Sequence, residues 1–172
     1  GSGKTPLVIR LVQLLAHAGF SPGIVSRGYR GGATQFPCLV QEGADPTLVG
    51  DEPLLVHQQT GCPVVIDRNR VRGARHLTSQ CGVDIVVSDD GLQHLRMSRA
   101  VEIAVIDGDR RFGNGYLLPA GPLRESPSRL DTVDFVVTNG GPALLGEYQM
   151  RTTINEAVHL TTGERRPLSQ FT

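Results

Sequence analysis

Short apolar runs alternate with longer segments of mixed polarity along most of the chain. The apolar runs are rich in Val and Ile and are bounded by polar or turn residues, as strands buried on both faces are. They span residues 23–26, 63–67, 84–88, 101–106 and 133–138.

Helical patterns occupy the segments between these runs. Apolar residues recur at helical spacing from Leu7 to Ala18, and Gly19 ends the pattern. Residues 51–60 and the arginine-rich residues 68–80 are further helix candidates. Buried strands separated by helices predict an α/β fold in which helices cover both faces of a mostly parallel sheet.

The pattern changes near Met150, where short strand-like pieces surround a polar turn at residues 161–164. A chain of 172 residues fits one domain, or one domain and part of another. We therefore predict a core over residues 1–149, and a linker with the start of a second, smaller lobe over residues 150–172.

Composition excludes several classes of protein. The 17 basic and 17 acidic residues cancel, so no nucleic-acid partner is expected, and no obligate protein partner is evident. The three cysteines are scattered without a C-x-x-C pair, which argues against a disulfide framework or a zinc site and favours a reducing compartment. No run reaches the roughly 18–20 apolar residues that a membrane-spanning helix needs.

The first six residues carry the first chemical signal. Residues 1–6 read Gly-Ser-Gly-Lys-Thr-Pro, which matches the end of the phosphate-binding loop G-x-x-x-x-G-K-[ST] and predicts a P-loop NTPase-like fold. Backbone N–H groups of such a loop hold phosphate oxygens, Lys4 adds a positive charge, and the Thr5 hydroxyl reaches Mg²⁺. Lys4 is the only lysine among the 17 basic residues, which favours a specific need for it. A chance match at a flexible terminus is the alternative.

Two adjacent carboxylates give the second signal. Asp89 and Asp90 follow the apolar run at residues 84–88, and a carboxylate at the end of such a strand holds Mg²⁺ opposite a phosphate-binding loop. A simple turn is the alternative for an isolated Asp-Asp-Gly. His94, four residues beyond Asp90, is either a site residue or a packed surface histidine.

Three further segments have both a structural and a functional interpretation. Asp51 either caps a helix or acts as a base toward an incoming hydroxyl. The segment from Arg27 to Tyr29 is either a tight turn or a site for an anionic ligand. The Gly- and Pro-rich residues 110–125 favour a functional loop, in which Arg124 either binds phosphate or forms a surface ion pair with Glu125.

These motifs occur together in an order that is characteristic of one family. S-R-G-Y, G-D-E-P, D-D-G-x-Q-H and R-F-G-N-G-x-L-L-P-A-G-P-L-R-E follow G-K-T-P, and over residues 1–139 the sequence resembles the tetraacyldisaccharide 4'-kinases of lipid A biosynthesis. The resemblance implies two lobes, the cofactors ATP and Mg²⁺, and transfer of the γ-phosphate to the 4'-hydroxyl of a tetraacylated glucosamine disaccharide 1-phosphate. The acceptor would be this acylated disaccharide lipid, met at the cytoplasmic face of the bacterial inner membrane. The family's N-terminal membrane helix would lie upstream of residue 1.

The resemblance also assigns roles to individual residues. It makes Asp51 the catalytic aspartate, with Lys4 and Arg124 steadying the transferred phosphate. The expected nucleotide-binding residues are Gly1, Ser2, Gly3, Lys4, Thr5 and Pro6, and the expected metal ligands are Thr5, Asp89 and Asp90. The candidate substrate-binding residues are Arg27, Gly28, Tyr29, Gln93, His94 and Asn114. A histidine partner of the catalytic aspartate is expected in the C-terminal lobe, but His159 lacks a matching motif.

Two other classes of protein stay open. A regulatory or partitioning nucleotide-hydrolysing switch would need no small-molecule acceptor. Residues 135–139 faintly resemble the strand before a guanine-reading N-K-x-D motif, but no lysine or aspartate follows. A non-catalytic remnant is the other alternative, and the intact set of Lys4, Asp51, Asp89 and Asp90 argues against it.

Overall fold

The structure, a computed structural model, describes residues 2–154, 156–159 and 164–171. Its helices are α1 (Lys4–His17), α2 (Pro46–Val49), α3 (Asp51–Thr60) and α4 (Arg70–Gln80), with 3₁₀ turns at Pro127–Thr132 and Leu168–Gln170. Its strands are β1 (Pro22–Ser26), β2 (Cys38–Leu39), β3 (Val64–Ile66), β4 (Ile85–Ser88), β5 (Ile103–Asp107), β6 (Phe135–Asn139), β7 (Glu147–Met150), β8 (Glu156–Val158) and β9 (Arg165–Pro167).

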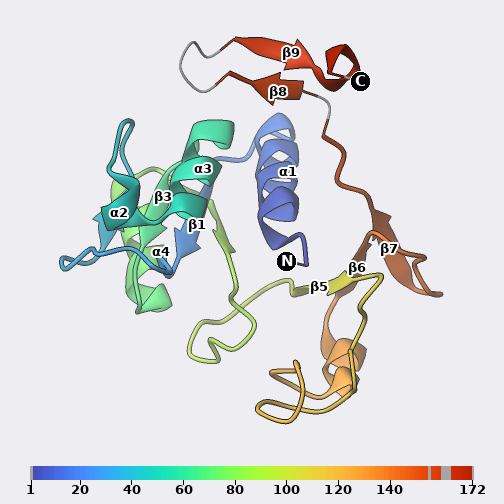
Figure 1. The fold of residues 1–172 in the computed structure, drawn as a ribbon. Helices are drawn as coiled ribbons and strands as arrows, with labels where there is room; N and C mark the ends of the chain where they lie inside the picture. Colours follow the sequence, from blue (N-terminus) through green and yellow to red (C-terminus); the bar gives the residue numbers. More distant parts are fainter. Residues whose placement is uncertain (1, 155, 160–163, 172) are drawn as a thin grey trace.

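The described strands form three sheets (Figure 1). The first has the order β2-β3-β1-β4, in which β3, β1 and β4 are parallel and the short β2 is antiparallel. The second is the parallel sheet β5-β6-β7, and β8 and β9 form an antiparallel hairpin. The predicted mostly parallel α/β fold is confirmed, and each of the five predicted strands forms.

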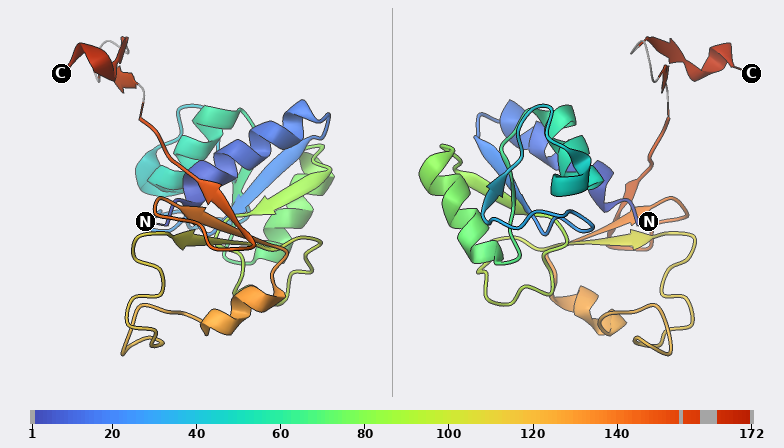
Figure 2. Two further views of the ribbon diagram at one scale, coloured as in Figure 1. Left: turned by 90° about the vertical axis from the view of Figure 1, so that its right-hand side faces the viewer. Right: turned by 60° about the vertical axis from the view of Figure 1, so that its left-hand side comes forward.

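The core of the first sheet explains why its strands are continuous apolar runs. Alternate residues of one strand point to opposite faces, so Ile24 packs in one buried cluster with residues of α1 and α3, and Val25 packs in the other with Leu77 of α4. Figure 2 shows α4 on the opposite side of this sheet from α1 and α3. Both faces are thus covered, which explains why these strands are almost entirely apolar.

The C-terminal residues leave this arrangement through an extended segment after β7 and end in the β8–β9 hairpin. Figure 2 shows the hairpin standing apart from the rest of the chain. The predicted boundary at residue 150 stays a prediction, and residues 161–163 of the predicted turn lie outside the described residues. In the part of the chain that the structure describes, no helix is long and apolar enough to cross a membrane.

Candidate active site

The candidate residues gather where the parallel strands of the first sheet end. Arg27 follows β1, Asp67 follows β3, and Asp89 follows β4. Parallel strands present their carboxyl ends at one edge of a sheet, and ligands of open α/β sheets bind at that edge. The topology therefore brings together three segments that lie 40 and 22 residues apart in the sequence.

The helix α1 begins at the predicted phosphate-binding loop. Gly3 precedes it with a φ of 90°, and a Cβ there would lie 2.4 Å from Nδ2 of Asn139, at the end of β6. Only glycine fits both this conformation and this close approach. Within the described part of the chain no side chain caps α1, and its first turn contains no acidic residue, which leaves a helix N-terminus suited to an anion. Gly1 lies outside the described residues, whereas Ser2, Thr5 and Pro6 lie at this terminus.

Two positively charged side chains from different parts of the chain contact Asp90. Nζ of Lys4 lies 3.6 Å from Oδ1 of Asp90, and Nη1 of Arg124 donates a hydrogen bond of 3.0 Å to Oδ2. Burial opposes ionisation of Asp90, but the hydrogen bond from Arg124 and the charge of Lys4 outweigh it and lower the pKa of this carboxyl. The structure thus joins the phosphate-binding loop, the Asp-Asp-Gly turn and the long loop. Arg124 pairs with Asp90 rather than with its neighbour Glu125.

Asp89 lies in a more buried and more acidic environment. Burial is the main factor that raises its pKa, and the negative charges of Glu52 and Asp90 raise it further against the opposing charges of Lys4 and Arg70. The mutual repulsion of these negative charges favours a positive charge near Asp89. Glu52 was missed by sequence reasoning, although it stands beside Asp51 in G-D-E-P, because its position in a first helical turn already explained it.

These oxygens fit the chemistry of Mg²⁺. Mg²⁺ prefers oxygen ligands, and proteins hold it through one or two carboxylates together with phosphates and water. Asp89, Asp90 and Thr5 carry oxygens of this kind, and their role as metal ligands stays a prediction. No group of three or more His, Cys, Asp or Glu side chains that could hold a metal ion exists among the described residues.

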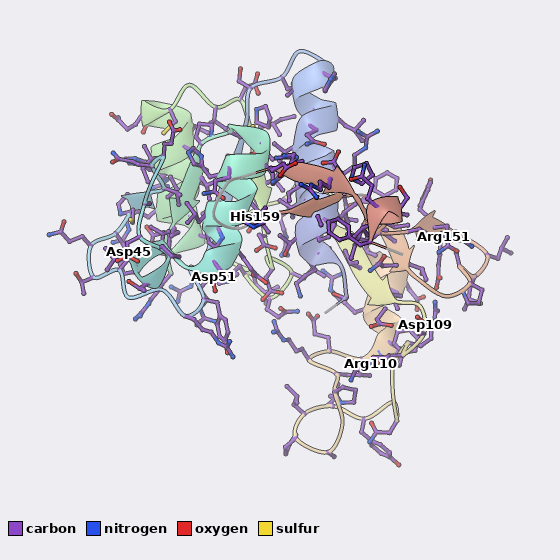
Figure 3. All side chains as sticks on the ribbon, turned by 45° about the horizontal axis from the view of Figure 1, so that its top comes forward. Asp45, Asp51, Asp109, Arg110, Arg151 and His159 are labelled. Atoms are coloured by element: carbon purple, nitrogen blue, oxygen red, sulfur yellow. The ribbon has the colours of Figure 1, made fainter. Side chains whose placement is uncertain are left out.

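Asp51 is the first residue of α3 and is exposed, at the end of the helix marked in Figure 3. Within the described residues its carboxylate has no hydrogen bond or ion pair. Gly50 before it has a φ of 87°, and a Cβ there would lie 3.0 Å from the Tyr29 carbonyl oxygen, so the start of α3 lies against the Arg27–Tyr29 turn. The structure therefore brings G-D-E-P and S-R-G-Y together.

The loop after β5 carries Arg124 back to the site. Gln93 accepts from Arg124 at 3.5 Å and donates to Oε1 of Glu125 at 2.5 Å, which connects the loop to the turn after β4. Asn114 holds the loop itself, since Nδ2 donates to the Ala120 carbonyl at 3.0 Å and Oδ1 accepts from the Tyr116 N–H at 3.2 Å. A substrate contact by Asn114 stays a prediction.

The candidate histidines differ in their positions. His94 is half-buried next to the Asp-Asp-Gly turn, and burial together with the charges of Arg70 and Arg27 lowers its pKa. His159 follows β8 in the hairpin that stands apart in Figure 2, and Figure 3 labels both His159 and Asp51. The structure gives no reason to assign His159 as the partner of Asp51.

This geometry places a helix N-terminus, a lysine, an acidic pair and an arginine at one sheet edge. The family model described as Tetraacyldisaccharide-1-P 4'-kinase matches residues 1–172 of the chain. The chain belongs to this family. The resemblance seen in the motifs is thereby confirmed over the whole chain.

Several curated family members are similar to the chain over nearly all of its residues. Tetraacyldisaccharide 4'-kinases from Ruthia magnifica subsp. Calyptogena magnifica and Nitrosococcus oceani are each 50% identical over 171 residues, which are 99% of this chain and 54% and 50% of those proteins. One from Vibrio cholerae is 49% identical over 172 residues, which are 100% of this chain and 51% of that protein. The chain thus spans about half the length of these relatives.

A solved structure of the family shares the fold. The crystal structure of "apo" form LpxK from Aquifex aeolicus, in complex with ATP, matches with a TM-score of 0.78 and 26% sequence identity. The match covers 99% of this chain and 56% of that one. The chain therefore shares the fold of that LpxK structure over nearly all of its residues.

Proposed function

We propose that the protein transfers the γ-phosphate of ATP to the 4'-hydroxyl of a tetraacylated glucosamine disaccharide 1-phosphate, giving lipid IVA. The observation that carries this is the convergence of Lys4 and Arg124 on Asp90, next to Asp89 and the start of α1, in a member of the kinase family. A related structure that holds ATP supports the nucleotide.

Each residue has a role that its position supports. Phosphoryl transfer asks a protein mainly for positioning and for neutralisation of charge. The N-terminus of α1 and Lys4 would hold the ATP phosphates, and Arg124 would neutralise charge on the transferred group. Thr5, Asp89 and Asp90 would hold Mg²⁺, which supplies further charge neutralisation when bound.

Asp51 would accept the proton of the acceptor hydroxyl or orient that hydroxyl. A carboxylate is a weak base, so Asp51 would serve best in a loose transition state or with a histidine partner. Its exposed carboxylate, free of partners among the described residues, supports a role toward an outside group. Arg27, Gly28 and Tyr29 beside it are the residues we assign to acceptor binding.

The acceptor is a membrane lipid, so we place the protein at the cytoplasmic surface of the bacterial inner membrane. The loop that carries Arg124 supports contact with lipid, because its side chains at Tyr116, Leu117 and Leu118 are 66%, 49% and 63% exposed. Apolar side chains on a loop tip at the site favour contact with an acylated ligand or a bilayer.

The test uses the protein of the complete reading frame in detergent micelles with MgATP and the acceptor. Mass spectrometry of the lipid should show one added phosphate, and this product should be lost with Lys4→Ala and strongly reduced with Asp51→Asn. Arg75→Ala, an exposed arginine of α4 without a role in the proposal, should leave the product unchanged. Hydrolysis of ATP without any change in the lipid would contradict the proposal and favour a regulatory switch.

A further inference from the structure

A second basic region adjoins the candidate active site. A cavity of about 460 Å³ lies between the start of α4 and the turn after β4. Its lining includes Arg68, Arg70, His94 and Arg96, and none of the residues that line it is acidic. Three guanidinium groups around one cavity give it a strong positive charge, which the family assignment and the catalytic residues leave unexplained.

The most informative side chain of the cavity is that of Arg70. It is only 3% exposed, and its Nη2 donates to the Asp89 carbonyl at 2.9 Å. Its Nε is buried and has no hydrogen-bond partner among the residues that the structure describes. An unpaired buried donor on a charged group is costly, so native proteins normally satisfy it with a ligand or a partner. The cavity beside Arg70 is the place from which an anion would do so.

The buried carboxylate of Asp67 does not supply that partner. Asp67 is fully buried, and its two oxygens accept from Nε and Nη2 of Arg72 at 2.7 and 2.9 Å. The hydrogen bonds of Arg70 therefore go to the backbone carbonyl oxygens of Asp67 and Asp89 rather than to a carboxylate, although the charges of Asp89 and Asp90 lie near it. Exposed Arg96 also has no ion pair among the described residues.

The start of a helix lies at the same place, where the Asn69 side chain already accepts from the Arg72 N–H at 3.1 Å. Asn69 and Val71 also line the cavity, so the first turn of the 11-residue helix α4 faces it. That turn contains no acidic residue, and the positive end of a helix favours an anion. Guanidinium groups and helix N–H donors together are the usual receptor for a phosphate monoester.

We propose that this cavity, with Arg68, Arg70 and Arg96, binds the phosphate group that the acceptor already carries. The inference rests on the proposed function and deepens it, because an acceptor of this family bears a phosphate besides the hydroxyl that is phosphorylated. Arg70 connects the two places, since it lines the cavity and also bonds to Asp89. The acceptor would be held at its phosphate end while its hydroxyl meets the catalytic residues.

The test compares two acceptors, the disaccharide 1-phosphate and the same lipid without that phosphate. Two variants of the protein of the complete reading frame are compared, Arg96→Ala alone and Arg96→Ala combined with Arg68→Ala. Each should raise KM for the phosphorylated acceptor about five- to tenfold or more, because charge-assisted hydrogen bonds to the phosphate are lost. KM for ATP and all constants with the unphosphorylated acceptor should stay unchanged. Both side chains are exposed, so folding should persist, which circular dichroism checks. Arg75→Ala, an exposed arginine of α4 that does not line the cavity, is the matched control.

The outcomes separate the two proposals. If the unaltered protein phosphorylates both acceptors equally well, or if the variants leave KM for the phosphorylated acceptor unchanged, the cavity assignment is wrong and the kinase assignment stands. A raised KM for ATP instead would assign the cavity to nucleotide phosphates and overturn the inference. Absence of transfer to either acceptor by the unaltered protein would overturn the proposed function and this inference with it.

Discussion

Glu147 anchors the long loop that carries Arg124, and replacing it tests the electrostatic reasoning quantitatively. Its two oxygens accept hydrogen bonds of 2.8 and 2.7 Å from Arg111, at the start of that loop, and Oε2 also accepts from the Thr138 hydroxyl and the Leu144 N–H. Hydrogen bonding from Arg111 is the main factor that lowers the pKa of Glu147, from 4.5 to about 2. We expect Glu147→Gln to destabilise the protein.

The magnitude follows from the pKa. A difference between 4.5 and about 2 corresponds to about 3 kcal/mol, at about 1.36 kcal/mol for each pH unit. Arg111 is 24% exposed, so solvent screening reduces this contribution to about 2 kcal/mol. Because the pKa is lowered on folding, the contribution is complete above pH 4.5 and is lost as the pH falls toward about 2.

Urea unfolding followed by circular dichroism measures the effect at pH 7 and pH 3. Glu147→Gln should lower the free energy of unfolding by about 2 kcal/mol at pH 7. At pH 3 this difference between the unaltered protein and the variant should be less than half as large. Glu42→Gln, at an exposed glutamate without a partner among the described residues, should change little at either pH. A gap of equal size at both pH values would show that packing, rather than charge, stabilises this residue.

Two further substitutions test the site. Gly28→Ala should cost about 2–4 kcal/mol of unfolding free energy, because its Cβ would lie 2.3 Å from Cγ2 of Ile66 in a left-handed conformation. Gly82→Ala has nearly the same φ with nothing within 4 Å, so it should cost only about 1 kcal/mol; equal losses would exclude the clash. Arg124→Ala should raise the pKa of Asp90, which NMR titration of its carboxyl carbon measures, and an unchanged pKa would mean that their hydrogen bond is absent in solution.

The fold was largely predictable because its strands are buried on both faces. Such strands must be nearly continuous Val and Ile, and this composition marks them in the sequence without any structural knowledge. The strand β7 escaped prediction because Glu147 and Gln149 make it polar, and β2 because two residues carry no pattern. Both β7 and β2 form because they pair with a neighbouring strand, and only the tertiary structure supplies that pairing.

The candidate site was predictable where a motif has a fixed local geometry. A loop that ends in Gly-Lys-Thr and a strand that ends in Asp-Asp meet by the topology of a parallel sheet, so Lys4 and Asp90 were found from sequence. Arg70 was not found, because the sequence shows only an arginine-rich helix. Which arginine of that helix is buried depends on how the helix is rotated against the sheet, and the sequence does not record that rotation.

Asp90 connects two segments, α1 and the loop after β5, that are not paired with each other in a β-sheet. Lys4 reaches it from α1, and Arg124 reaches it from the loop after β5, and these three side chains are between 42% and 58% exposed. Contacts between exposed charges weaken as dissolved salt screens them, whereas the hydrogen bonds of β1 do not. The stiffness of the loop should therefore depend on ionic strength: added salt should accelerate hydrogen exchange at the Leu118 amide and leave that of Val25 unchanged. A salt-insensitive Leu118 would mean that the loop is held by its own hydrogen bonds instead.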